Sequence, residues 1–171
     1  MVTVTKGIWG YLMNQDREAH PWVAEGAHRV RFAVHSIFVE SEAQTVKAAQ
    51  RAERLNFDAY WAHDHPTRLM DCWGQLLMLA MATESLRLIS LVSCIYYRNP
   101  HLLARQAADV DRVSGGRLVL GLGIGDDVPE FDQMCIPFPD FRSRVRGFAA
   151  ALRRCGAALR VGSSGPTSPR W

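Results

Sequence analysis

The chain has 171 residues, 48% hydrophobic and 22% charged, which is the composition of a globular protein with one buried core. All 17 acidic residues precede Phe141 and seven of the 20 basic residues follow it, so the net charge of +3 belongs to the C-terminal segment. The mildly acidic remainder predicts no nucleic-acid partner, and the lack of a run of about 18 apolar residues predicts no membrane role. Because residues 1–28 lack the layout of a secretory leader, we expect a cytoplasmic protein.

The first predicted elements lie between residues 31 and 82. Arg31–His35 reads as a strand, and Ser41 with Gln44 matches a capping box that opens a helix running to about Leu55. After a turn, the short apolar segment Ala59–Ala62 is expected to form a second strand. Asp71 is a suitable N-cap for a helix that follows.

The next segment predicts a strand, a helix and another strand in close succession. Leu88–Ser93 is an almost unbroken aliphatic run, as expected for a strand covered on both faces. Asn99-Pro100 provides a cap and a first helical residue without an unpaired amide, and a glycine pair at 115–116 can end that helix. Arg117 begins the fourth strand and is expected to support its lower end. A last helix is expected over Arg142 to about Arg154.

This strict alternation predicts an α/β fold with an all-parallel sheet, either a doubly wound sheet or a (β/α)8 TIM barrel. The glycine-rich segment Gly121–Gly125 lacks the dinucleotide-binding spacing and is followed by the carboxylates Asp126, Asp127 and Glu130. These carboxylates would repel a pyrophosphate, which favours the barrel, whose active sites gather at the carboxyl ends of its strands. We interpret Asp127 and Glu130 as capping or solvated charges.

Several longer motifs together resemble the N-terminal half of the luciferase-like monooxygenase family. They are AERLNFDAYWAHDH at 52–65, YRNPHLLARQAADVDRVSGGRLVLGLGIG at 97–125, Glu130-Phe131 and Pro137-Phe138, and the resemblance extends over about residues 30–147. The resemblance implies a (β/α)8 barrel truncated to about four βα units. It also implies coenzyme F420 or FMN as cofactor, oxidoreductase or monooxygenase activity, and a small organic substrate.

Three polar residues, His63, Asp64 and His65, end the second strand and should project from the catalytic rim. An imidazole there can bind a reduced ring or pass on a proton, which makes His65 the first catalytic candidate; the alternative is a histidine that caps loop carbonyls. The resemblance implies that the Asp64-His65 pair contacts F420. Asp126 is a further candidate acid or base. Neither histidine nor cysteine spacing predicts a metal site.

Backbone at the ends of the third and fourth strands completes the expected cofactor site. The resemblance implies a non-proline cis peptide at Cys94-Ile95, forming a bulge behind the deazaflavin ring. Gly123 and Gly125 lack a β-carbon and allow the backbone to approach a planar ligand.

The expected organisation is an N-terminal arm at 1–28, a half-barrel at 29–155 and a disordered tail at 156–171. From Arg142 the chain holds seven arginines and no acid, where the family has an acidic amphipathic helix, so we hypothesise a frameshift near residues 146–150. Besides an oxidoreductase, two other readings follow: an inactive fragment, or a non-enzymatic flavin-binding half-barrel that pairs as a homodimer and covers its open edges.

Overall fold

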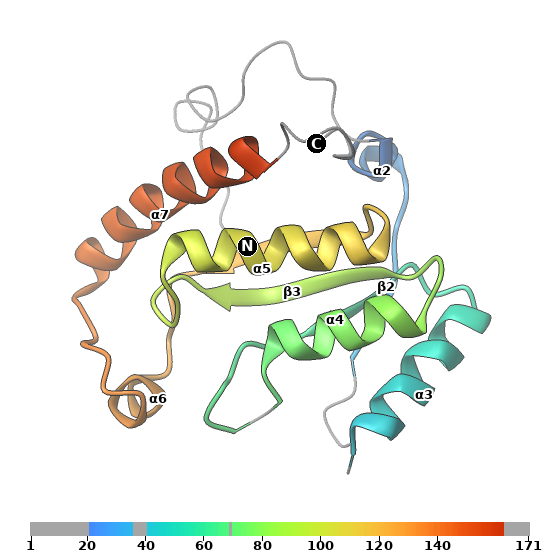
Figure 1. Ribbon diagram of the computed structural model, residues 1–171, viewed down its shortest axis with the longest axis horizontal. Helices are drawn as coiled ribbons and strands as arrows, with labels where there is room; N and C mark the ends of the chain where they lie inside the picture. The colour runs from blue at the N-terminus through green and yellow to red at the C-terminus, as the bar shows by residue number, and fades with distance from the viewer. Residues whose placement is uncertain (1–20, 36–40, 69, 163–171) are drawn as a thin grey trace. The chain divides into compact units, whose positions relative to one another are not determined.

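The computed structural model describes residues 21–35, 41–68 and 70–162 (Figure 1). Of the described residues, 21–30 belong to one compact unit and those from Arg31 to Gly162 belong to another. The described part of the first unit consists of helix α2 (Pro21–Glu25) and a 3-10 turn, η1 (Gly26–His28). The expected N-terminal arm therefore contains helix where it is described, and residues 1–20 lie outside the described part.

A four-stranded parallel sheet forms the centre of the second unit. Its strands are β1 (Ala33–Val34), β2 (Ala59–Ala62), β3 (Arg87–Cys94) and β4 (Leu118–Gly123), and they neighbour one another in chain order. A doubly wound sheet reverses its strand order at a switch point, whereas a barrel adds each strand beside the previous one. The order β1-β2-β3-β4 is therefore that of a barrel segment, and it decides between the two predicted architectures.

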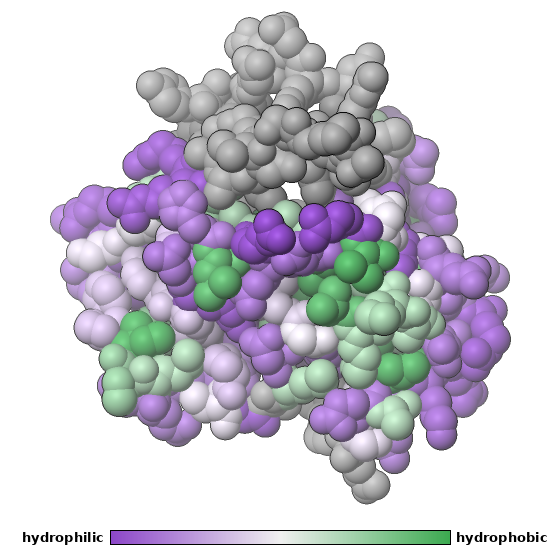
Figure 2. All heavy atoms as spheres, viewed as in Figure 1, coloured by the Kyte–Doolittle hydropathy of each residue, from purple (hydrophilic) through white to green (hydrophobic). Residues whose placement is uncertain are grey.

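The connecting helices form a layer in the same order as the strands. Helices α3 (Glu42–Arg54), α4 (Cys72–Ala82), α5 (Pro100–Ser114) and α7 (Phe141–Gly162) each contact the next one, and Figure 1 shows α4 and α5 on either side of β3 in the view. Figure 2, drawn from the same side, shows mostly hydrophilic side chains with separate hydrophobic patches. The helices therefore present a largely polar outer surface.

Local capping explains where these helices begin. The Asp71 Oδ2 accepts a hydrogen bond of 2.8 Å from the amide of Gly74, and the Asn99 Oδ1 accepts one of 2.9 Å from the amide of His101. Helix α5 ends at Gly115, whose φ of 70° is a left-handed conformation that costs glycine little. These predicted boundaries are confirmed.

The buried core lies between the sheet and the helix layer. Strand residues on this side and apolar residues from the facing helices fill it; they include Tyr60, Ala62, Leu76, Leu79, Leu88, Leu103, Ala107 and Val110. At the lower edge, the buried guanidinium of Arg117 donates five hydrogen bonds of 2.7–2.9 Å, four of them to backbone carbonyls. The expected support role of Arg117 is confirmed, and it leaves the opposite, carboxyl edge for a site.

Two elements differ from the prediction. Helix α7 continues to Gly162, so residues 156–162 are helical rather than part of a disordered tail, because alanine and arginine are strong helix formers. Residues 163–171 lie outside the described part. The short helix α6 (Val128–Gln133) was not expected, although Asp127 caps it and Pro129 stands in its first turn. Among the described residues, no helix combines the length and the apolar character that a bilayer span needs.

Candidate active site

The alternation of side chains along β2 and its extension sends neighbouring residues to opposite faces of the sheet. Tyr60 and Ala62 face the helices and are fully buried, and Asp64 is buried with them. The residues between and after them, Trp61, His63 and His65, are partly exposed. We call the side that bears these three rings the open face of the sheet.

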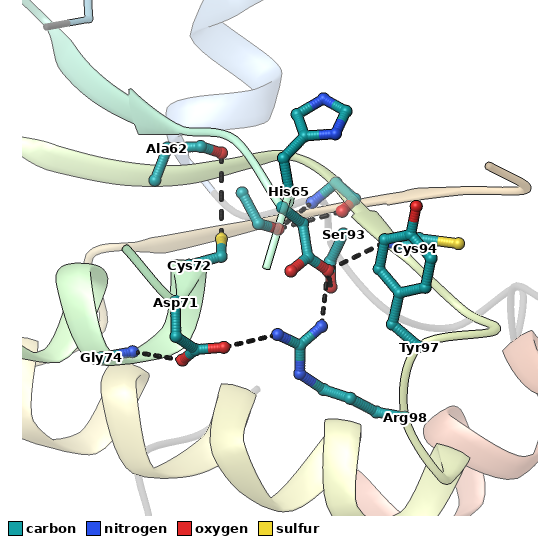
Figure 3. Close-up of polar contacts among 12 residues, drawn as sticks. Ala62, His65, Asp71, Cys72, Gly74, Ser93, Cys94, Tyr97 and Arg98 are labelled. Atoms are coloured by element: carbon teal, nitrogen blue, oxygen red, sulfur yellow. Dashed lines mark hydrogen bonds and ion pairs between the residues drawn. The ribbon is translucent and has the colours of Figure 1, made fainter. Parts of the chain in front are cut away.

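Asp64 ties together the ends of three elements on the helix side. Its Oδ2 accepts hydrogen bonds from the Ser93 hydroxyl at 2.7 Å, the Cys94 amide at 3.0 Å and the Arg98 Nη1 at 2.6 Å. Arg98 also donates to the Asp71 Oδ1 at 2.6 Å, which reaches the cap of α4 (Figure 3). The Asp64 side chain is 0% exposed, so, contrary to the expectation, it presents no surface to a ligand. It lies on the same side of the sheet as Tyr60 and Ala62, and its role is structural.

His65 belongs to a second polar cluster, built around Glu130. Its Nδ1 lies 2.8 Å from the Glu130 Oε2, which also accepts a 2.8 Å hydrogen bond from the Tyr97 hydroxyl. The Glu130 Oε1 accepts from the Thr67 hydroxyl at 3.0 Å and from the Thr67 amide at 3.2 Å. The side chain of His65 is 31% exposed and that of Glu130 only 1%, so the imidazole covers a buried carboxylate.

Electrostatics keep the Glu130 carboxyl ionised. Burial acts to raise its pKa, but the hydrogen bonds from His65, Tyr97 and Thr67 outweigh burial and lower the pKa below the ordinary 4.5. Burial, together with the bond that the phenol donates to Glu130, raises the pKa of Tyr97. A charged carboxylate and a neutral phenol therefore stand behind His65 at neutral pH.

The elements that carry this cluster meet at one rim. His65 follows β2, Tyr97 follows β3, and Glu130 lies in α6, which follows β4. Figure 3 shows the ring of His65 pointing away from Arg98 and Asp71. His65 therefore lies beside residues that follow β3 and β4, as expected.

A bulge interrupts β3 before its end. The strand advances from Ser90 to Ser93 while its partner β4 advances by one residue fewer, and the Leu91-Val92 bond is cis. The predicted position of the cis bond, Cys94-Ile95, is wrong because β3 stays paired with β4 up to Cys94. Leu91 and Val92 are 45% and 44% exposed, whereas Cys94 and Ile95 are buried.

Burial also limits the chemistry of Cys94. Its pKa is raised to about 11, chiefly by burial, so the thiol is neutral and is no nucleophile at neutral pH. Ile95, at 5% exposed, likewise presents no surface to a ligand. Cys94 and Ile95 are therefore buried structural residues, and the exposed apolar surface lies at Leu91 and Val92.

The glycines of β4 are required by their protein neighbours. Leu118, Leu120 and Leu122 pack toward the core, so Gly121 and Gly123 face the open side. A β-carbon on Gly123 would overlap the Val92 side chain, which therefore lies on the open face. Gly125 has a φ of 73°, and a β-carbon there would meet Phe131 and Cys94. Val92 thus occupies the space beside Gly123 where the prediction put a planar ligand.

The other predicted carboxylates have different surroundings. Asp126 is exposed on the loop between β4 and α6, outside the His65 cluster. Asp127 accepts from the Glu130 amide at 3.1 Å and pairs with Arg68, which confirms its capping role. Potential ligand atoms of His65, Asp127 and Glu130 lie within 4.8 Å of one another. Each of these carboxylates already has protein partners, so the cluster by itself assigns no metal site.

Sequence reasoning missed His35 and Trp61, which adjoin the predicted His63 on the open face. His35 stacks on Trp61 with ring centroids 4.2 Å apart, and the His63 ring lies 4.5 Å from Trp61 and 5.6 Å from His65. Burial, then the nearby charges of His35 and His65, lowers the pKa of His63. The spacing of residues 61, 63 and 65 by two was the available signal for this aromatic row. The partnership of His65 with Glu130 had no local signal, because 65 residues separate them.

Comparisons with known proteins identify the family of the chain. The family profile of luciferase-like monooxygenases matches residues 21–166, a longer span than the motifs indicated. The 5,10-methylenetetrahydromethanopterin reductase of Methanolobus tindarius is 34% identical over 117 residues, which are 68% of this chain and 35% of that enzyme. The enzyme of that name from Methanopyrus kandleri is 35% identical over 88 residues, 52% of this chain and 25% of its own length.

Solved structures give the same fold. A coenzyme F420 dependent tetrahydromethanopterin reductase from Methanopyrus kandleri superposes with a TM-score of 0.59 at 30% identity, covering 65% of this chain and 31% of that one. An FMN complex of a type II Baeyer-Villiger monooxygenase from Pseudomonas putida gives a TM-score of 0.61 at 14% identity, covering 70% and 38%. The chain thus spans about a third of the length of these relatives. With most of its residues matched by the family profile, the chain belongs to the luciferase-like monooxygenase family.

Proposed function

We propose that the chain forms the cofactor-binding rim of an oxidoreductase that uses F420 or FMN and acts on a small organic substrate. The observation that carries this proposal is the contact of 2.8 Å between the His65 Nδ1 and the buried carboxylate of Glu130, at the rim where the strands end. A histidine oriented by a buried carboxylate, with its far ring edge toward the open face, can bind and exchange a proton with a ligand.

The chemistry of the open face fits a flat redox ring. Val92 and Leu91 provide exposed apolar side chains on the bulge, and the partly exposed rings of Trp61 and His63 adjoin His65. Apolar support together with a polar group is what planar cofactors require of a protein. A bound deazaflavin or flavin would supply hydride transfer, which no protein side chain provides.

The relatives make F420 the first cofactor to test. Three relatives at more than 30% identity are named as 5,10-methylenetetrahydromethanopterin reductases, and a solved relative at 30% identity is described as coenzyme F420 dependent. The FMN-bound relative is 14% identical and supports the fold alone. FMN is therefore the second ligand in the same experiment.

Within this proposal, the chain's own residues divide the work. His65 would hydrogen-bond the ligand and hold or release a proton at Nε2, while Val92 and Leu91 would contact the ring. Asp126, exposed on the adjoining loop, is the next candidate acid or base for the substrate. Asp64 would act through the fold, because its carboxylate contacts Ser93, Cys94 and Arg98.

Fluorescence titration tests the proposal directly. Adding the purified chain should quench the fluorescence of F420, or of FMN, with saturation, and His65→Ala should lose this response. The matched control is His101→Ala, since His101 is an exposed histidine in the first turn of α5 and is not one of the residues that bond Glu130. Titrations of both cofactors that leave the fluorescence unchanged would contradict the proposal.

The purified chain also separates this proposal from the two other readings. Expressed in a host that makes both cofactors, it should carry a deazaflavin or flavin absorbance band and should turn over a reduced or oxidised substrate. A coloured dimer without turnover would select the non-enzymatic half-barrel. A colourless, poorly ordered protein would select the inactive fragment.

A further inference from the structure

We propose that Glu130 is a positioning residue that holds His65 in its Nδ1-protonated tautomer and so presents an unprotonated Nε2 at the open face. The ligand group that meets this nitrogen is then an N–H or O–H donor. This last step rests on the proposed function, because it assumes that the ligand binds beside His65. The tautomer itself does not depend on any ligand.

The chemistry of the contact determines which ring nitrogen carries the proton. A neutral imidazole has one donor and one acceptor nitrogen, and an ionised carboxylate can only accept. The Glu130 Oε2 lies 2.8 Å from Nδ1, and burial of the carboxylate leaves only 1% of that side chain exposed. Nδ1 therefore donates to Glu130, and in the neutral ring Nε2 becomes the acceptor.

Other groups prevent Glu130 from turning away. The Tyr97 hydroxyl donates to Oε2, the Thr67 hydroxyl and amide donate to Oε1, and the Asp127 Oδ1 accepts from the Glu130 amide at the start of α6. Both carboxylate oxygens thus have donors, which come from the two segments that follow β2 and β3. The geometry is that of an orienting carboxylate behind a functional histidine, a type of partner whose loss typically costs about 10- to 100-fold in ligand affinity at metal sites.

The neighbouring charges do not offer His65 a competing acceptor of the same quality. Asp127, the nearest other carboxylate of the cluster, pairs with Arg68 and caps α6, and the ring of His63 lies 5.6 Å from that of His65. When His65 takes up a proton at Nε2, Glu130 is the adjacent counter-charge. The pair can therefore accept a proton from a ligand without leaving an unpaired charge at the rim.

NMR of the chain without cofactor tests the tautomer. Long-range 1H–15N spectra of the 15N-labelled protein at about pH 8 distinguish protonated from unprotonated ring nitrogens, and the signals of His65 are those lost in His65→Gln. We expect a protonated Nδ1 and an unprotonated Nε2 in the wild type. A ring protonated at Nε2 instead would overturn the proposal, whatever the variants do.

Variants then show that Glu130 is responsible. Glu130→Gln should shift His65 toward the Nε2-protonated tautomer, and Tyr97→Phe should retain the wild-type tautomer because the carboxylate is still present. Asp132→Asn, which removes an exposed carboxylate on the same helix α6, is the matched control and should change nothing. An unchanged His65 spectrum in a folded Glu130→Gln protein would contradict the proposal.

Cofactor titration of the same variants distinguishes this proposal from the proposed function. If F420 or FMN binds, Glu130→Gln should weaken binding about 10-fold while Asp132→Asn leaves it unchanged. If the tautomer depends on Glu130 but neither cofactor binds, the positioning role holds and the proposed function fails. If the cofactor binds equally well to Glu130→Gln, the assignment of a donor group opposite Nε2 is wrong.

Discussion

Asp64 and His65 are neighbours in sequence, yet they belong to opposite kinds of polar cluster. The Asp64 carboxylate is enclosed, and its donors come from β3 and from Arg98, so it joins parts of the fold. In the other cluster the carboxylate is enclosed but the histidine in front of it is 31% exposed. Alternation along the strand, rather than residue type, therefore decides which of two adjacent polar groups can meet a ligand.

We expect the largest loss in the free energy of unfolding from a substitution that breaks the Asp64 cluster. Asp64→Ala leaves Arg98, whose side chain is 9% exposed, with Asp71 as its remaining carboxylate partner among the described residues, and it removes the acceptor of the Cys94 amide. Removing one partner of a buried ion pair typically costs about 3–5 kcal/mol of the free energy of unfolding. Urea denaturation followed by circular dichroism measures the loss.

His65→Ala is the comparison for that variant. It removes a partly exposed side chain and one hydrogen bond, so the free energy of unfolding should fall by only about 1 kcal/mol. The same substitution should abolish the quenching of cofactor fluorescence, because His65 is proposed to contact the cofactor. Asp64→Ala should affect that quenching only through the loss of stability. Equal losses of stability in the two variants would contradict the division into a structural and a functional cluster.

The sequence predicted the parts of this fold that depend on local chemistry. Asp71, Asn99 and Gly115 end or begin helices where expected, because capping involves residues three or fewer positions away. The rim position of His65 followed from its place at a strand end. Its partner Glu130 could not be predicted, since the contact depends on how α6 folds back against a segment 65 residues earlier.

The bulge in β3 is a backbone feature that local sequence likewise could not predict. The aliphatic run of β3 predicted a regular strand, and no local pattern marks the register shift between Ser90 and Ser93. The shift is a property of the pairing with β4, and it depends on Gly121 and Gly123 leaving space for the bulged strand. For this reason the exposed apolar surface at Val92 was missed, and buried Cys94 was named in its place.

The next largest loss of unfolding free energy is expected from alanine substitutions of the two β4 glycines, which test the position of Val92 on the open face. Gly123→Ala and Gly121→Ala should each lower the free energy of unfolding by about 1–3 kcal/mol, because the added carbon overlaps a neighbour. The neighbour of Gly123 is the Val92 side chain, whereas that of Gly121 is the backbone carbonyl of Ser90. Denaturation of the double variants should therefore show that Val92→Ala restores stability to Gly123→Ala and little to Gly121→Ala. Equal restoration would mean that Val92 does not lie over Gly123.

The smallest effect concerns the pH dependence of the His65 cluster. The pKa of Glu130 in the folded protein lies below its ordinary 4.5, so its ionised form stabilises the fold. That contribution is complete above pH 4.5 and is lost as the pH falls from 4.5 through the lower pKa of the folded state. Glu130→Gln should lack this part of the acid-induced loss in unfolding free energy, measured by urea titration at a series of pH values. Asp126→Asn, whose carboxylate is exposed, should keep the wild-type slope, because the effect requires a carboxylate that is enclosed by donors and not merely one beside α6.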